Sequence, residues 1–118
     1  MNTHALEAGM RETLGSLLHS GISVQKDVIE NTPLRFAVSL EELLNGYHHD
    51  LPSLLESFEH SSLDSLILCR RIEFFSLCEH HLLPFFGHVS IGYIPKGSVI
   101  GLSKMPRLVE AFSRRLQL

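Results

Sequence analysis

Cysteines and long apolar runs are both scarce in this chain, and each scarcity excludes a class of protein. The 118 residues contain only two cysteines, Cys69 and Cys78, which are too few for the disulfide framework of a small secreted domain. No apolar run is long enough to span a bilayer. The N-terminus lacks the basic region followed by an apolar stretch that marks a secretory signal. We therefore expect a cytoplasmic protein with reduced or metal-bound thiols and no membrane partner.

Charge is divided unevenly along the chain, whose length suits one domain with its own core. Residues 1–64 carry three basic and ten acidic side chains, whereas residues 65–118 carry seven basic and three acidic. We interpret 1–64 as an N-terminal helical region and 65–118 as the portion that carries the chemistry, within one structural unit. The basic portion favours an anionic ligand, although it also fits an ordinary solvated face. Nucleic acid is not expected, because the pI is 6.2 and aromatic residues do not interleave with basic ones.

The first half of the chain shows the three- and four-residue spacing of amphipathic helices. One apolar face runs through residues 6–18, and Gly21 is expected to end that helix. A second helix is expected to begin with Thr32 as its N-cap and Pro33 at its first helical position. That helix is expected to end at residues 45–46.

The middle of the chain, residues 47–62, is polar. A short helix is expected at residues 53–58. Three histidines in this segment, His48, His49 and His60, are expected to be solvated.

The second half of the chain changes to the alternation of strands. Residues 65–77 and 87–94 predict two antiparallel strands, and residues 95–98 predict a turn. After Gly101 the helical spacing returns and is expected to continue to Leu118. Helices combined with an antiparallel strand pair place the fold in the α+β class.

The densest polar cluster is the run Cys78, Glu79, His80 and His81, set among large apolar residues. Such a cluster is costly to bury unless a metal or a charged substrate satisfies it. Cys78 and His81 stand three residues apart, which lets both converge on one ion, and Cys and His are ligands that zinc takes. Zinc typically needs further ligands, which would come from elsewhere in this chain or from another chain. The alternative is a buried cysteine with surface histidines at a junction of strand and loop.

A second cluster begins at Gly101. Ser103 is a suitable N-cap, and a helix start presents free backbone N–H groups. Lys104 and Arg107 then fall on one face near the positive end of the helix dipole, an arrangement that binds phosphate. The alternative is a capped surface helix with ordinary cations.

Three segments together resemble the GTP cyclohydrolase I family. They are Phe-Ser-Leu-Cys-Glu-His-His-Leu-Leu-Pro-Phe-Phe-Gly at 75–87, Tyr-Ile-Pro-Lys-Gly at 93–97 and Val-Ile-Gly-Leu-Ser-Lys at 99–104. The resemblance implies a tunnelling-fold domain of helices on an antiparallel sheet, assembled as a homo-oligomeric ring, commonly a decamer. It also implies hydrolysis of GTP at C8 of guanine, which gives formate and 7,8-dihydroneopterin triphosphate for folate or pterin synthesis.

The resemblance assigns roles to the first cluster. Cys78 and His81 would be zinc ligands. His80 would contact the purine and move protons as a catalytic residue, and Glu79 would shape the site or hydrogen-bond within it.

In the second cluster, the resemblance implies that Ser103 touches ribose or phosphate. Lys104 and Arg107 would hold the triphosphate of GTP.

Members of the family continue further, with a Gln-Glu pair that grips guanine and with a histidine and a second cysteine that complete the site. This sequence ends at Leu118, so the resemblance implies a C-terminally truncated member that lacks the third zinc ligand. One interpretation is therefore a GTP cyclohydrolase I polypeptide. The alternative is a non-catalytic or split-enzyme subunit that binds nucleotide and needs a second polypeptide to complete the site.

Overall fold

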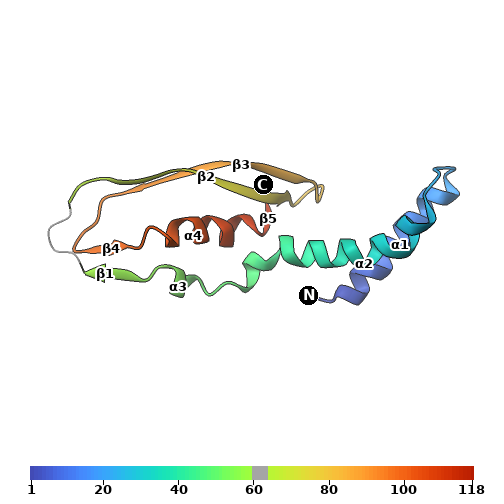
Figure 1. Cartoon of the computed structure of the whole chain (residues 1–118), viewed down its shortest axis with the longest axis horizontal. Coiled ribbons are helices and arrows are strands. Elements are labelled where there is room, and N and C mark those ends of the chain that lie inside the picture. Colours follow the sequence, from blue (N-terminus) through green and yellow to red (C-terminus); the bar gives the residue numbers. More distant parts are fainter. Residues whose placement is uncertain (60–63) are drawn as a thin grey trace. The chain divides into compact units, whose positions relative to one another are not determined.

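The computed structural model describes residues 1–59 and 64–118 (Figure 1). The chain forms two compact units, Met1–Glu42 and Leu43–Leu118. Within the described ranges, no helix combines the length and apolar character needed to cross a membrane.

Two expectations concern the middle of the chain. The sequence pattern divides the chain after residue 64, and this functional division stays a prediction. The boundary between the two compact units lies elsewhere, between Glu42 and Leu43. Of the three histidines expected to be solvated, His48 is exposed and His49 is half-buried. His60 lies outside the described residues.

Helix α1 (Thr3–His19) forms where the apolar spacing predicts it. The side chain of Asn2 accepts a hydrogen bond of 3.1 Å from the backbone N–H of Ala5, which satisfies one free donor of the first turn. Gly21 follows the helix with a φ of 84°, a conformation that glycine adopts without steric cost.

Helix α2 (Lys26–Leu43) begins seven residues before Pro33, so the prediction that Pro33 occupies its first position is wrong. The first turns are stabilised locally, because Asp27 lies near the positive end of the helix and accepts a hydrogen bond of 2.7 Å from Asn31. Pro33 removes one backbone donor from the helix interior, and the helix continues through it. The buried side chains of α2 are Pro33, Ala37 and Leu40.

The second unit opens with short elements. A 3-10 helix η1 (Asn45–His48) follows α2, and helix α3 (Leu51–Leu54) comes slightly earlier than the expected helix at 53–58. Strand β1 (Ser57–Glu59) then pairs antiparallel with strand β4 (Ser98–Ile100). Helix α3 precedes β1 in the sequence, and the last helix follows β4. The pairing of these two strands therefore brings α3 and the start of the last helix to the same region of the unit.

Two long strands form the main sheet, as the alternation predicts. Strand β2 (Ile67–Cys78) pairs antiparallel with strand β3 (Pro84–Tyr93), and β3 begins three residues before the expected position. The register shifts between Cys69 and Ile72, where Arg71 has a φ of 56°, so a bulge interrupts the ladder.

The end of the chain differs from the expectation of one continuous helix to Leu118. Helix α4 (Lys104–Ser113) stops at Ser113, and strand β5 (Leu116–Gln117) pairs in parallel with the end of β2. The sheet order is β3-β2-β5, so β2 is central. The helical spacing of apolar residues continues past Ser113, but the open edge of β2 offers backbone hydrogen bonds that compete with the helix.

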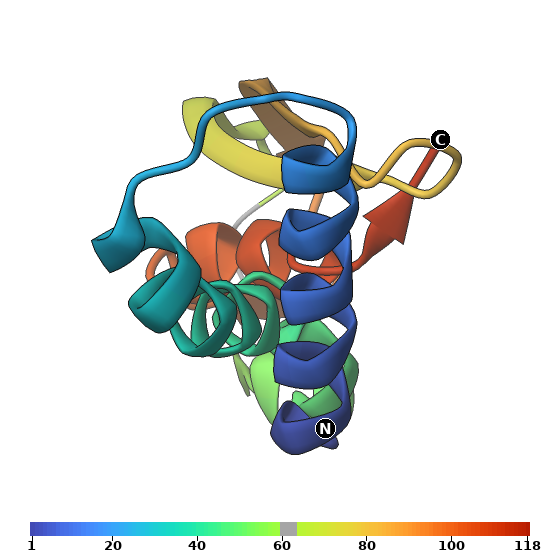
Figure 2. The same ribbon diagram turned by 90° about the vertical axis from the view of Figure 1, so that its right-hand side faces the viewer.

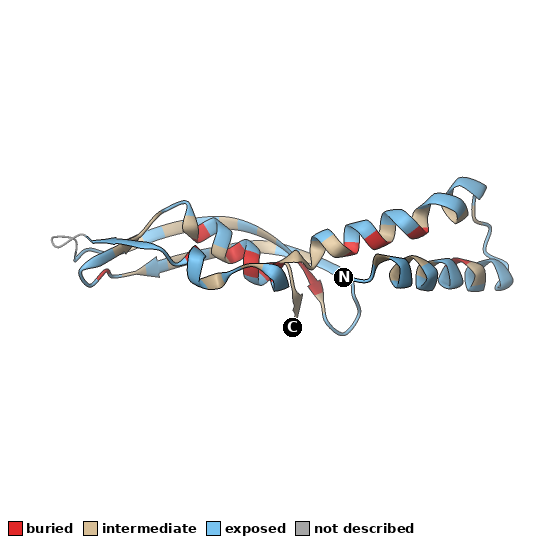
Figure 3. Cartoon of the chain, turned by 90° about the horizontal axis from the view of Figure 1, so that it is seen from below, coloured by how far each residue is buried: buried red, intermediate tan, exposed pale blue. Residues whose placement is uncertain are grey.

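The core of the second unit lies between α4 and β2. Met105, Val109 and Ser113 are buried along one face of α4, and Ala111 is buried on another side of the helix (Figure 3, buried residues in red). On β2, Leu77 is buried, and the hydroxyl of buried Ser76 donates a hydrogen bond of 3.2 Å to the carbonyl of Arg115. Helices packed on an antiparallel sheet confirm the α+β class.

Candidate functional site

The Cys-Glu-His-His cluster lies where β2 turns into β3. The backbone closes this loop with two hydrogen bonds, from the N–H of Cys78 to the carbonyl of Leu83 (2.9 Å) and from the N–H of Leu82 to the carbonyl of Cys78 (2.8 Å). Leu82 has a φ of 55°, a left-handed conformation that a leucine seldom adopts. In Figure 2 strand β5, at the C-terminus, lies beside this loop. The loop therefore has a defined shape that orients its side chains.

Cys78 and His81 converge within the loop. The Cys78 Sγ lies 3.4 Å from the His81 Nδ1. A hydrogen bond from the His81 side chain, followed by hydrogen bonds from the backbone amides of His80 and His81, lowers the pKa of the Cys78 thiol below its ordinary value. The thiolate is the form of cysteine that ligates metals. The structure thus brings together the two residues predicted to be zinc ligands.

The donor set of this pair fits part of a zinc site. One thiolate and one imidazole are ligands that zinc takes, and both belong to one short loop. Across residues 1–59 and 64–118, the structure groups no three His, Cys, Asp or Glu side chains that could hold a metal ion. A third protein ligand is therefore not supplied by the part of this single chain that the structure describes.

Glu79 and His80 lie on the outside of the same loop. The Glu79 Oε1 is 3.7 Å from the His80 Nε2, and both side chains are exposed. The ring of His80 is nearly perpendicular to that of His81, with centroids 6.1 Å apart. A carboxylate this close can orient the imidazole ring.

The second cysteine lies away from this cluster. Cys69 is half-buried in β2 opposite Ile91. Cys78 is nine positions further along the strand, which corresponds to roughly 30 Å. Cys69 is therefore not a third ligand to an ion held by Cys78 and His81.

The second cluster, Ser103, Lys104 and Arg107, which is predicted to bind phosphate, lies at the N-terminus of α4. Ser103 occupies the N-cap position, but its hydroxyl makes no capping hydrogen bond. The amides of Lys104 and Met105 donate to the carbonyls of Gly101 and Leu102, and Pro106 has no N–H group. The expectation of free backbone donors at this helix start is therefore wrong for residues 104–106, and the nearby side chains are the main candidates for anion contacts.

Lys104 has a partner that the sequence did not reveal. Its Nζ donates to the Oε2 of Glu56 at 2.9 Å and to the backbone carbonyl of Ser53 at 3.2 Å. The Lys104 side chain is 18% exposed, whereas that of Glu56 is 67% exposed. The hydrogen bond from Lys104 and its positive charge lower the pKa of the Glu56 carboxyl. Forty-eight residues separate the two side chains, and no motif links them.

Arg107 is exposed one turn further along α4. In the described part of the chain it forms no ion pair with a carboxylate. Together with the uncapped hydroxyl of Ser103, it remains available to an anion at this end of the helix.

The two clusters lie at opposite ends of α4. Lys104 is the first residue of this ten-residue helix, which is about 15 Å long. Cys78 pairs with Gln117, which follows the other end of the helix. Within one chain, the candidate metal pair and the candidate phosphate contacts therefore lie apart by about the length of α4.

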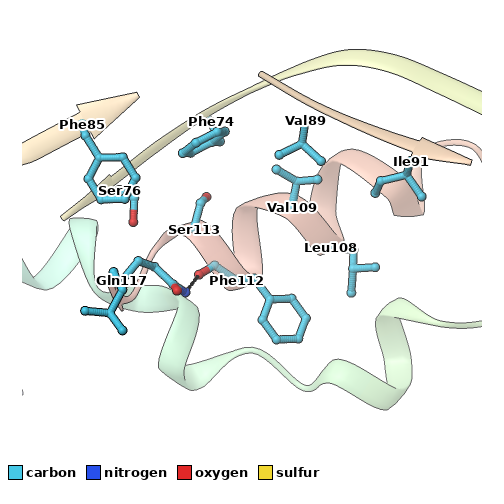
Figure 4. Close-up of a pocket in the computed structure, with 11 residues that line it drawn as sticks. Phe74, Ser76, Phe85, Val89, Ile91, Leu108, Val109, Phe112, Ser113 and Gln117 are labelled. Carbon is cyan, nitrogen blue, oxygen red and sulfur yellow. Dashed lines mark hydrogen bonds between the residues drawn. The ribbon is translucent and has the colours of Figure 1, made fainter. Parts of the chain in front are cut away.

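An apolar cavity of about 390 Å³ lies between the main sheet and α4 (Figure 4). Phe74 and Phe85 line it from the sheet, and Leu108 and Phe112 line it from the helix. The Gln117 side chain turns back to donate a hydrogen bond of 2.6 Å to the carbonyl of Phe112. None of the residues predicted for catalysis, metal or phosphate lines this cavity, so it is not the predicted site.

Comparison with known proteins gives a consistent result. A family model described as GTP cyclohydrolase I matches residues 8–118. The chain is 43% identical over 116 residues to "GTP cyclohydrolase 1" of Parabacteroides distasonis, covering 97% of this chain and 58% of that protein. It is 45% identical over 111 residues to the protein of the same name from Wolinella succinogenes, covering 92% and 59%.

A third relative of the same name, from Campylobacter lari, is 50% identical over 99 residues, covering 83% of this chain and 52% of that protein. The chain therefore spans about half the length of the curated relatives it matches.

Proposed function

The chain belongs to the GTP cyclohydrolase I family, and on that premise we propose that it contributes to a site that hydrolyses GTP. The reaction proposed opens the guanine ring at C8, releases formate and yields 7,8-dihydroneopterin triphosphate. The α+β architecture is consistent with the tunnelling fold of this family. The observation that carries the proposal is the 3.4 Å approach of Cys78 and His81 in a backbone-ordered loop.

Zinc is the proposed cofactor, and Cys78 and His81 would hold it. When bound, it supplies a Lewis acid that makes water a nucleophile near neutral pH. The lowered pKa of Cys78 is consistent with this role, because it eases the loss of the proton that metal ligation requires. A further protein ligand would come from outside the described part of this chain.

His80 and Glu79 are proposed to move and hold protons beside the purine. The exposed imidazole of His80 is the type of side chain most often used in general acid–base catalysis. Glu79, 3.7 Å away, would orient that imidazole.

The triphosphate of GTP is proposed to bind at the N-terminus of α4. Ser103 offers a hydroxyl that makes no capping hydrogen bond, Lys104 an ammonium group on a largely buried side chain, and Arg107 the guanidinium of an exposed residue. Arg and Lys side chains are the usual partners of phosphate oxygens.

We further propose that several copies of the chain assemble. In the described sheet, β3 is hydrogen-bonded on one side only, by β2, so its other edge is open to pairing. The length of α4 between the two clusters also allows different copies to supply the metal pair and the phosphate contacts of one site. Light scattering coupled to gel filtration tests this directly, and a monomer at every concentration would contradict it.

The test of function is formate release and pterin fluorescence from purified protein given GTP and zinc, with bound zinc measured in parallel. Cys78→Ser and His81→Ala should each lose bound zinc and turnover, while Cys69→Ser should keep both. Zinc and GTP binding without turnover would indicate the non-catalytic or split-enzyme subunit. Zinc bound equally by all four proteins would overturn the proposed metal pair.

A further inference from the structure

The ammonium group of Lys104, which is proposed to bind the triphosphate, already forms an ion pair with the carboxylate of Glu56. The Oε2 of Glu56 lies 2.9 Å from the Nζ of Lys104. We propose that Glu56 competes with phosphate oxygens for Lys104 and thereby sets the affinity of the site for polyphosphate ligands. This inference rests on the proposed role of Lys104.

The geometry around Lys104 leaves room for a phosphate oxygen. An ammonium group has three donors, of which one reaches the Ser53 carbonyl and one reaches Glu56. A phosphate oxygen can take the remaining donor or replace the carboxylate. Any oxygen bonded to this nitrogen lies close to the Glu56 charge, so the two anions repel each other.

The two partners differ in how firmly they are held. Lys104 is mostly buried and is also anchored by the backbone carbonyl of Ser53, at the end of α3. Glu56 is 67% exposed, and in the described part of the chain Lys104 is its one hydrogen-bonding partner. A substitution that removes the Glu56 carboxylate should therefore leave the Lys104 ammonium in place. A substitution that removes the Lys104 ammonium removes the proposed contact with phosphate.

Two physical arguments indicate that Glu56 competes with phosphate for Lys104 rather than holding Lys104 in place for it. Glu56 is the exposed partner of this ion pair, and a carboxylate that lies mostly in solvent contributes little to stability, so Glu56 is not needed to fold this corner. A triphosphate carries several negative charges against the single charge of Glu56, so it can displace the carboxylate. Removing the carboxylate charge should then strengthen phosphate binding, because Lys104 would no longer be neutralised by a neighbour.

The experiment measures binding of inorganic tripolyphosphate and of GTP by calorimetry to the full chain and three variants. Glu56→Gln keeps an acceptor of the same size without the charge, and should bind both ligands about fivefold more tightly at low salt. The gain should shrink as salt rises. Glu73→Gln is the matched control, since Glu73 is an exposed carboxylate on β2 and should leave affinity unchanged.

Lys104→Gln separates this inference from the function on which it rests. Loss of binding in Lys104→Gln together with a gain in Glu56→Gln supports the inference. Loss in Lys104→Gln with equal or weaker binding in Glu56→Gln overturns the competition and leaves the phosphate role intact. Unchanged binding in Lys104→Gln, or no binding by any variant, overturns both.

Discussion

The backbone N–H of Glu79 donates a hydrogen bond of 2.8 Å to the carbonyl of Gln117. This bond joins the loop that carries the candidate metal pair to the strand that follows α4. Because Cys78 also pairs with Gln117 in the sheet, the ligand loop is held from its own strand and from β5. The order of the proposed metal site should therefore depend on Leu116 and Gln117.

Deleting residues 116–118 should destabilise the second unit and weaken zinc binding. The deletion removes the ladder between β2 and β5, the bond to Glu79 and part of the cover of Leu77, which is 3% exposed. At about 1 kcal/mol for each net hydrogen bond, the expected loss in free energy of unfolding is about 2–4 kcal/mol. Urea denaturation and zinc titration measure the two effects.

Deleting Leu118 alone is the matched control for that experiment. Leu118 is 86% exposed and lies outside β5, so its removal should change neither the free energy of unfolding nor the affinity for zinc. Equal stability of the two deletions would contradict the role assigned to β5.

Zinc should protect Cys78, but not Cys69, from alkylation. Cys78 lies against His81 in the proposed metal pair, whereas Cys69 is in the strand far from it. In a time course with iodoacetamide followed by peptide mass spectrometry, added zinc should slow modification of Cys78 at least several-fold. Modification of Cys69 serves as the internal control.

A His81→Ala variant sharpens that comparison. Without the imidazole, zinc should lose most of its protective effect on Cys78. Equal protection in the variant would exclude His81 as a ligand.

Much of the fold could be predicted because apolar spacing reports burial directly. The spacing places α1, β2, β3 and the start of α4 within a few residues of their positions. The first error arises where two local signals compete. Pro33 after Thr32 is a typical helix start, yet Asp27 and Asn31 stabilise an earlier first turn.

The second error arises from long-range pairing. The helical spacing persists after Ser113, but the edge of β2 draws residues 116–117 into a strand. No local pattern encodes a partner 39 positions away in the sequence.

The candidate site divides in the same way. Cys78 and His81 meet because the turn between them is local, so their spacing is sufficient to predict the contact. The pairing of Lys104 with Glu56 depends on how α3 and α4 pack, and spacing carries no information about it. The neutralising partner of a predicted cation is therefore visible only in the structure.

The ion pair of Glu56 predicts a pH dependence of stability with a definite sign. Lys104 lowers the pKa of Glu56 in the folded chain relative to the unfolded chain, so the pair stabilises the fold above the unfolded-state pKa. The stabilisation is lost as the pH falls through the folded-state pKa, because the carboxyl is then protonated in both states. We therefore expect the melting temperature of the wild type to exceed that of Glu56→Gln by a small margin at neutral pH.

That margin should close as the solution is acidified below about pH 4, which thermal melts at several pH values measure. The control is Glu73→Gln, which removes an exposed carboxylate elsewhere on the sheet and should leave the pH profile as in the wild type. A margin that grows on acidification would contradict the assigned sign.

Gly46 should be the least replaceable glycine of the second unit. A Cβ built there would lie 2.7 Å from the Arg114 carbonyl oxygen and closer still to that of Ala111, and backbone atoms cannot move aside cheaply. Gly46→Ala should therefore cost about 1–3 kcal/mol of unfolding free energy or more. Its N–H also donates to the Arg114 carbonyl at 3.0 Å, so a shift of the backbone would break that bond and disturb the approach to β5.

Gly15→Ala is the matched control, because nothing lies within 4 Å of a Cβ at this helical position. Alanine there should raise stability by about 0.5–1 kcal/mol, since it lowers the backbone entropy of the unfolded chain. Urea denaturation of both variants beside the wild type measures the contrast. Similar small effects from the two substitutions would show that the end of α4 does not pack against Gly46 in solution.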